Sequence, residues 1–501
     1  MRVRSRALVA ATPTWVAVLT VTAGFAMVSW AGLEQHRDGG GEDSYSYVDY
    51  VQWLDKQHRI PRQDQNYEYA LPIGVPWVGV QVQRAFGPPK YDSPSSPVLQ
   101  GMPKLLRRLL WVALILAGGL AIARSRRLEP GWLIGIGLWL AAAAWASAYV
   151  IAAANNEAWI PLTLIAFLAA VGLVPASAWL AHEVWPHRRR IPVLAAFGAC
   201  LVPAVFAATL YFHPDPPFAL LATIAVALVV RALRTGLTIG AGAAAGAVIG
   251  LAGLVRQSVP LLIVSLALAV VLVARKGAVR YLAGGAVAGF VVLGWWWYQQ
   301  WERYSNPIKS NLNRQGYMID HQPVSWFLSF PIDLITHPYK PSFMRTLLPR
   351  FHAYLWSDWY GGYHNWDDPK RFATFFASTQ SVLGLGGDAL VVGGVAALGI
   401  PALVRVARRR DVLPTDAGFA TLALFFILSW ASFVGTLVRF PQHDNDPVKV
   451  RYLLFLTPVA VIFGIAAGGA LVRRGGWRRT ALYAWLAAYT TSWVFTILTA
   501  F

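Results

Sequence analysis

Charged side chains are scarce in this sequence. Asp, Glu, Lys and Arg make up 13% of its 501 residues, whereas 56% are hydrophobic and the mean hydropathy is +0.47. A soluble domain typically carries about 25% charged residues. So little charge cannot cover a water-facing surface over this length, so the chain must be solvated mainly by lipid. The shortage excludes an ordinary soluble globular protein.

Cysteine is almost absent as well, since Cys200 is the only one. An internal disulfide is therefore excluded, and we expect Cys200 to be a small buried apolar residue. The loops assigned below to the outer side also lack a P-loop or another glycine-rich phosphate loop, so no nucleotide is expected. No internal repeat is visible.

Long runs of apolar residues are the most prominent feature of the sequence. A membrane helix needs about 20 mostly apolar residues to cross about 30 Å of hydrocarbon, and about thirteen stretches qualify. The sequence therefore predicts an all-α polytopic bundle that forms a single transmembrane domain over residues 1–501. The first run follows a basic start and predicts an uncleaved first helix. The runs are 15–31, 105–122, 131–154, 159–181, 191–212, 218–232, 237–255, 259–274, 281–298, 384–404, 418–438, 452–472 and 481–500.

The formal net charge of +19 would suit a nucleic-acid-binding protein, but the positions of the charges argue against one. Basic residues cluster at every second gap between spans, which is the positive-inside pattern. We therefore expect no nucleic-acid partner, and anionic membrane lipids as local partners. The pattern places the N-terminus in the cytoplasm of a multi-pass cell-membrane protein. The clusters lie at 124–127, 188–190, 231–234, 275–280, 405–410 and 473–479.

Acidic residues show the opposite bias. Two outer loops are long, 32–104 and 299–380, and most of the 24 acidic residues lie outside. Solvation of long loops explains this bias in part, and an outward-facing functional site is the other explanation. With this topology the inner acids are Glu129, Glu183, Asp411 and Asp416.

Both long loops contain aromatic amphipathic stretches, which we expect to form interfacial helices. The first stretch includes Tyr47, Tyr50 and Trp53, and a second covers 73–86. A third aromatic cluster runs over 356–366. Aromatic rings near carboxylates also stack on sugars, so sugar binding is the alternative.

Candidate chemistry begins with Glu42 and Asp43, shortly after the first span. A carboxylate there lies near the membrane surface, where it can meet a lipid-borne substrate. A general base must come within about 3 Å of the hydroxyl that it deprotonates. An ordinary solvated loop acid is the alternative.

Three further polar features lie at the outer ends of spans. Asp215 is either a helix cap or a site residue, and with His213 it leaves a divalent metal open, because two residues do not define a metal site. Arg256 lies at membrane depth, where its planar fork fits a phosphate, and snorkelling to head groups is the alternative. Arg451 and Tyr452 open a span, and for Arg451 the alternative is a surface ion pair.

The order of these motifs resembles the GT-C glycosyltransferases, polytopic enzymes that use polyprenyl-phosphate sugars, and especially the protein O-mannosyltransferase and aminoarabinose transferase group. Ser44 stands where the family typically has the second acid of a pair, and Ile73 follows Pro72 where a second proline is usual. These departures from the family pattern leave open whether Glu42 or Asp43 would be the base. The matching segments are Asp43-x6-Tyr50-Val51, Tyr67-Glu68-x3-Pro72, 211–217, 253–257, Arg451-Tyr452 and, more loosely, the tryptophan-rich 356–364.

The resemblance implies an inverting transferase of the cell envelope that moves a sugar from a polyprenyl-phosphate donor to an acceptor hydroxyl on the extracytoplasmic side. The acceptor would be a glycan, lipid or protein, with Asp43 or Glu42 as base. A polymerase or ligase of lipid-linked glycans and a lipid or solute transporter are the alternatives. The implied substrate-binding residues are Arg256, Arg451, Tyr452, Glu68, His213, Asp215, Asp358 and His364.

Overall fold

The computed structural model describes residues 2–35, 42–62, 65–66, 70–86, 160–309, 371–409, 413, 415–439 and 450–500. All regular elements in these ranges are helical, which confirms the predicted all-α class. The predicted spans 105–122 and 131–154 lie outside the described residues, as do Glu68, Asp358 and His364.

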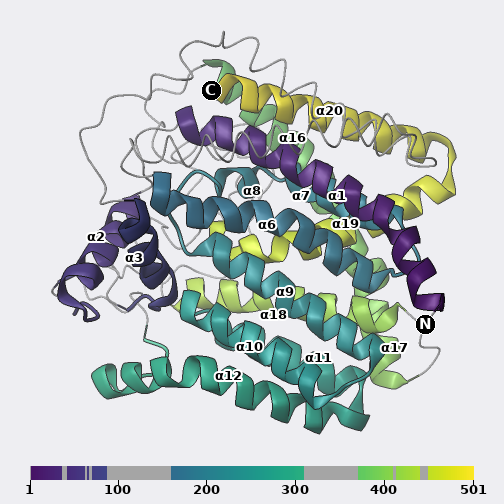
Figure 1. The fold of residues 1–501 in the computed structure, drawn as a ribbon. Helices are drawn as coiled ribbons and strands as arrows, with labels where there is room; N and C mark the ends of the chain where they lie inside the picture. Colours follow the sequence, from purple (N-terminus) through teal and green to yellow (C-terminus); the bar gives the residue numbers. More distant parts are fainter. Residues whose placement is uncertain are drawn as a thin grey trace.

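Long helices run between the two ends of a bundle (Figure 1). Six helical stretches are long and apolar enough to cross a membrane: 162–184, 215–235, 277–304, 379–408, 416–436 and 452–474. They belong, in order, to α6 (Ile160–Val184), α9 (Asp215–Thr235), α12 (Arg275–Tyr304), α16 (Arg371–Gly394) with η4 (Val395–Gly399) and α17 (Ile400–Arg408), α18 (Asp416–Arg439), and η5 (Val450–Leu456) with α19 (Thr457–Arg474). Shorter or less apolar helices complete the bundle: α1 (Arg2–Gln35), α10 (Ile239–Val255), α11 (Val259–Val273) and α20 (Gly476–Ala500).

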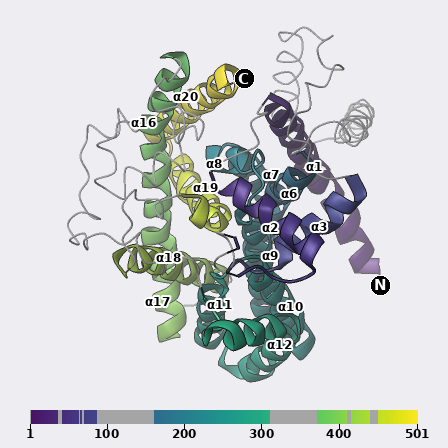
Figure 2. The ribbon, with the colours of Figure 1, turned by 90° about the vertical axis from the view of Figure 1, so that its left-hand side faces the viewer.

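The two ends of the bundle differ in composition. Two short helices, α2 (Glu42–Gln57) and α3 (Gly74–Phe86), lie over the ends of α6 and α9, and we call this the α2–α3 end (Figures 1 and 2). The opposite end carries the turns between α9 and α10 and between α19 and α20, and we call it the basic end because of its arginines. By the positive-inside rule the basic end is predicted to be cytoplasmic.

One predicted span is not a continuous helix. The run 191–212 folds as α7 (Arg190–Cys200) and α8 (Pro203–Ala207), separated at Leu201 and Val202. Pro203 disfavours the helical conformation at the preceding residue, and Val202 is extended, with φ −85° and ψ 112°. The Leu201 carbonyl accepts a hydrogen bond of 2.9 Å from the Tyr489 hydroxyl of α20. Cys200 is buried, as predicted.

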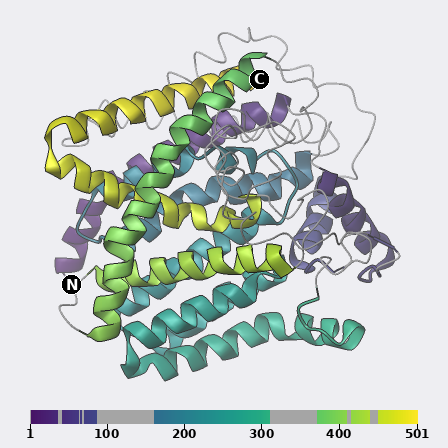
Figure 3. The ribbon, with the colours of Figure 1, turned by 180° about the vertical axis from the view of Figure 1, so that it is seen from behind.

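The span predicted at 384–404 belongs to a longer helix that crosses α18, α19 and α20 (Figure 3). It consists of α16 (Arg371–Gly394), a π-helical turn η4 (Val395–Gly399) and α17 (Ile400–Arg408). Like α12, which continues to Tyr304, it extends into the range predicted for the second long loop.

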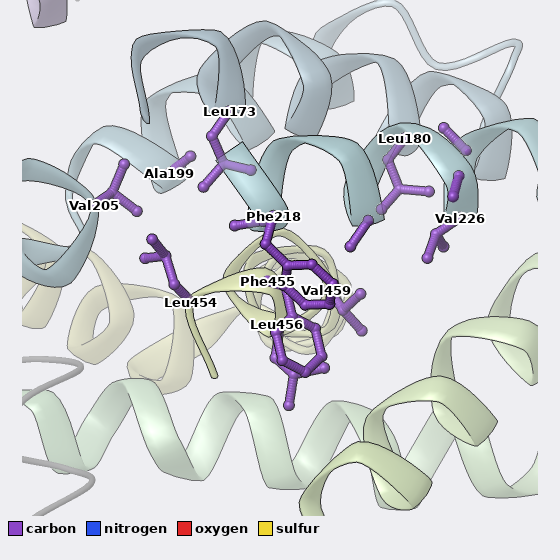
Figure 4. Packing of buried hydrophobic residues seen from close by; sticks show 14 of the residues in the cluster. Leu173, Leu180, Ala199, Val205, Phe218, Val226, Leu454, Phe455, Leu456 and Val459 are labelled. Atoms are coloured by element: carbon purple, nitrogen blue, oxygen red, sulfur yellow. The ribbon is translucent and has the colours of Figure 1, made fainter. Parts of the chain in front are cut away.

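Apolar side chains from distant segments form one core. Phe218 of α9 packs edge to face against Phe455 of η5 (Val450–Leu456), with ring centroids 5.4 Å apart. Leu173 and Leu180 of α6 lie on the other side of α9 (Figure 4). Phe218 is buried, so the first turn of α9 and the residues before it are held in place by packing.

Helices α10 and α12 pack closely through small residues. A Cβ atom on Gly246 would lie 2.0 Å from the Gly285 carbonyl oxygen, and one on Gly242 would lie 2.0 Å from the Tyr281 carbonyl oxygen. The two backbones are therefore in direct contact, as small residues permit in a membrane.

The predicted lipid-anchoring role of the α2 aromatic residues is corrected by the structure. Tyr47 and Tyr50 are 5% and 0% exposed and pack against the rest of the protein, because α2 rests on the bundle through this face. Trp53 is only partly buried. On α3, by contrast, Trp77 is 55% exposed, as expected of an interfacial helix.

Two of the predicted inner acids are described, and each pairs with an arginine. Glu183 of α6 contacts Arg234 of α9 and accepts a hydrogen bond of 2.9 Å from Trp179 Nε1. Asp416 receives two hydrogen bonds from Arg405, at 2.7 and 2.8 Å. These pairs join neighbouring helices at the basic end, which is a structural role.

Glu183→Gln is expected to lower the free energy of unfolding by about 1.5–3 kcal/mol, the usual range for a hydrogen bond to a charged group. Glu183 is buried, and the substitution keeps its shape but removes its charge. Thermal unfolding in detergent measures the effect. Asp55→Asn is the control, because its pair with Arg84 is solvent-exposed and contributes less than about 1 kcal/mol. Equal shifts in the two variants would contradict the assignment.

Candidate functional site

A cluster of polar and aromatic side chains lies at the α2–α3 end. Its members come from four separate segments: α2, the turn before α9, the end of α10, and η5. They are Tyr47, His213, Asp215, Arg256 and Tyr452, and we call them the Asp215 cluster.

Asp215 is the first residue of α9 and is 3% exposed. Two prolines follow it in the first turn, where their fixed φ suits a helix start and their missing N–H groups cost nothing. The positive end of the helix dipole stabilises a carboxylate at this position. Local sequence and helix electrostatics together explain a buried negative charge here.

Both oxygens of Asp215 are engaged. Arg256 Nη1 contacts Oδ1, and His213 Nδ1 lies 2.6 Å from Oδ2. The Asp215 backbone N–H donates a hydrogen bond of 3.2 Å to that same Nδ1. Asp215 thus orients an imidazole and a guanidinium at once.

Arg256 is held from a second direction. It follows the last residue of α10 with an extended backbone, φ −148° and ψ 145°, so its side chain leaves the helix axis. The guanidinium carbon lies 4.7 Å from the ring centroid of Tyr452, a cation–π contact. Its side chain is 18% exposed. An arginine held by a carboxylate and a ring presents a fixed cation.

The α2 helix reaches the cluster through Tyr47. This ring lies edge-on to His213, with centroids 5.3 Å apart and an interplanar angle of 83°. The helix begins at Glu42, so Asp43 is its second residue and lies one turn before Tyr47. Residues four apart share one face of a helix. The side chains of Glu42 and Asp43 are outside what the structure describes.

The first loop is also fastened directly to the end of α10. Gln257 Nε2 donates to the Ala70 carbonyl oxygen. A Cβ atom on Gly74 would lie 2.5 Å from the Leu254 carbonyl oxygen, so the start of α3 rests on the α10 backbone. The loop and Arg256 are therefore parts of one packed unit.

The structure brings together four of the predicted site residues, namely His213, Asp215, Arg256 and Tyr452. The backbone of Arg451 lies beside Tyr452 in η5, and its side chain is outside the described part.

Two features were missed by sequence reasoning: the Asp215–Arg256 ion pair and the contact of Tyr47. A signal for the pair was present, since both residues end spans on the same predicted side of the membrane. Nothing in the sequence gave their distance.

The divalent metal stays a prediction. In the described ranges no three or more His, Cys, Asp or Glu side chains are grouped so as to hold a metal ion. His213 and Asp215 contact each other, and Asp215 also contacts an arginine. His213, Asp215 and Arg256 therefore form an ion-pair network.

No family model and no curated protein sequence matches the chain. Among solved structures, ArnT from Cupriavidus metallidurans in the apo state aligns with a TM-score of 0.40 and 16% identity, covering 91% of this chain and 78% of ArnT. The oligosaccharyltransferase AglB from Archaeoglobus fulgidus, in complex with an inhibitory peptide and a dolichol-phosphate, aligns with a TM-score of 0.48 and 14% identity. That alignment covers 96% of this chain and 56% of AglB.

Because each TM-score is below 0.5 and each identity is below 25%, these alignments carry no argument about substrate or mechanism.

Proposed function

We propose that this chain is a membrane glycosyltransferase of the GT-C type, which transfers a sugar from a polyprenyl-phosphate donor to an acceptor hydroxyl at the extracytoplasmic face. The observation that carries the proposal is the convergence of Asp215, Arg256 and Tyr452 at the α2–α3 end, opposite the basic end. These are the residues that the motif resemblance assigns to the substrate, although they are far apart in the sequence.

Arg256 is the proposed group that binds the donor phosphate. A guanidinium fits a phosphate through paired N–H donors, and its strength grows where water is excluded. Asp215 and Tyr452 hold the guanidinium in place before substrate arrives. As the sugar–phosphate bond breaks, negative charge accumulates on the lipid phosphate, and the fixed cation stabilises that charge.

Asp43, or Glu42, is the proposed general base. The acceptor hydroxyl oxygen forms a bond to the anomeric carbon as the bond from that carbon to the phosphate oxygen breaks. The hydroxyl proton passes to the carboxylate, and the leaving group departs as polyprenyl phosphate. Attack opposite the leaving group inverts the anomeric centre. Residue 43 lies one turn before Tyr47 on α2, and Tyr47 contacts His213 of the Asp215 cluster, which supports this assignment.

Asp43→Asn is expected to lower sugar transfer by about 100-fold to 10,000-fold, the usual contribution of a general base. The assay uses protein reconstituted in vesicles, a radiolabelled polyprenyl-phosphate sugar and a hydroxyl acceptor, and it counts label on the acceptor. Asp49→Asn, on the same helix and exposed, is the matched control. Full activity in both Asp43→Asn and Glu42→Gln would refute the assignment of the base.

A further inference from the structure

Helix α2 has two separate sets of contacts. Against α3 it is fixed by Val51, whose methyl group would lie 2.7 Å from a Cβ atom on Gly79, and by the ion pair between Asp55 and Arg84. These contacts join α2 to its neighbour in the same loop. Helix α2 also contacts His213 of the Asp215 cluster through the ring of Tyr47.

From Tyr47 a continuous path of contacts leads to Arg256. The Tyr47 ring lies edge-on to His213. His213 Nδ1 accepts a hydrogen bond from the Asp215 backbone N–H and lies 2.6 Å from Asp215 Oδ2, and the other oxygen of Asp215 contacts Arg256. Tyr47, His213 and Asp215 are 5%, 5% and 3% exposed. Buried groups in defined orientations form a rigid connection, because protein interiors are close-packed.

We infer that Tyr47 and His213 are positioning residues, which set the place of α2, and with it the carboxylate at residue 43, relative to the guanidinium of Arg256. The inference rests on the proposed function. Sugar transfer requires the base and the phosphate-binding group on opposite sides of one reacting carbon, at fixed separation. A misplacement of about 1 Å can cost about 100-fold in rate.

The two residues have different expected kinetic signatures. Tyr47→Leu removes the ring but leaves the Asp215–Arg256 pair, so kcat should fall about 10-fold to 100-fold while the donor KM stays within about 2-fold. His213→Phe keeps a ring against Tyr47 but removes the Nδ1 atom that contacts Asp215. It should therefore loosen Arg256 and raise the donor KM as well as lower kcat.

Conservative and control variants separate positioning from general damage. Tyr47→Phe keeps the edge-on ring and should retain kcat within about 3-fold. Trp53→Leu removes a larger ring from the same helix, one that contacts Arg59. It should leave kcat and the donor KM near their original values. If Trp53→Leu lowered kcat as much as Tyr47→Leu, the inference would be overturned.

A distance measurement tests the inference without any activity. Cys200→Ala removes the only native thiol, and Asp49→Cys on α2 and Arg303→Cys on α12 then provide two exposed sites for spin labels. Pulsed electron paramagnetic resonance should give a narrow distance distribution that broadens or shifts with Tyr47→Leu and not with Tyr47→Phe. An unchanged distribution with Tyr47→Leu would overturn the inference. Absence of sugar transfer by the unaltered chain would refute the proposed function instead, and the distance result would still decide whether Tyr47 places α2.

Discussion

Removing the charge of Asp215 alone is expected to be more damaging to stability than removing both charges of its ion pair. Asp215→Asn leaves the Arg256 cation largely shielded from water, and breaking a buried pair on one side costs about 3–5 kcal/mol. Arg256 is 18% exposed, so partial hydration should bring the loss toward the lower end of that range.

The reverse substitution leaves an uncompensated anion. In Arg256→Gln, the carboxylate of Asp215 is 3% exposed and keeps only the contact with His213 among the two contacts described above. The double variant Asp215→Asn/Arg256→Gln removes both charges, so it should recover at least half of the stability lost in either single variant. Thermal unfolding of the four proteins in one detergent gives the coupling free energy directly.

The effects on stability and on sugar transfer should differ among these four proteins. Arg256→Gln and the double variant both lack the cation that holds the donor phosphate, so transfer should fall about 100-fold or more in each. A double variant no more stable than either single variant would contradict the ion pair. Normal transfer by Arg256→Gln would contradict the assignment of the phosphate group.

The sequence predicted the helices well because their signal is local. An apolar run of membrane length predicts a helix without reference to its neighbours, and α6, α9, α10, α12, α18 and α19 all overlap predicted runs. The break at Leu201 and Val202 has a local cause too, since Pro203 disfavours the helical conformation at Val202.

The site was predictable only in part because its contacts are not local. Asp215 and Arg256 were each recognised as polar residues at the outer end of a span, but whether they touch depends on how α9 and α10 pack. The buried face of α2 shows the same limit. Tyr47 and Tyr50 have the composition of lipid anchors, and only the tertiary structure shows that they face protein.

The ion pairs at the two ends of the bundle have different surroundings. Glu183 at the basic end is tied to Arg234 and to Trp179 of its own helix, and these contacts account for a helix–helix joint. Asp215 connects an arginine, an imidazole and, through that imidazole, a helix from another loop. A cluster that connects four segments of the chain is suited to binding a substrate as well as to stabilising the fold.

Gly246→Ala is expected to destabilise the protein by about 3 kcal/mol or more, a large effect for one methyl group. The added Cβ would lie 2.0 Å from the Gly285 carbonyl oxygen and 2.6 Å from its Cα atom. Both are backbone atoms, so no side-chain rotation can relieve the clash, and α10 and α12 must move apart. A Cβ atom at Gly240, which lies closer to the start of α10, would meet no atom within 4 Å. At this position alanine should stabilise the protein by up to about 1 kcal/mol, because alanine has a higher helix propensity than glycine.

The two substitutions should therefore shift the melting temperature in opposite directions. The helix that moves in Gly246→Ala should be α12. Only 28% of the apolar part of α12 is buried, whereas α10 also packs against α9 and α3. Arg256 should then keep its place, and the protein that remains folded should keep its transfer activity per molecule. Melting curves in detergent, together with the activity of the folded fraction, test both points. A Gly246→Ala protein that melts no lower than Gly240→Ala would show that the α10 and α12 backbones are not in contact.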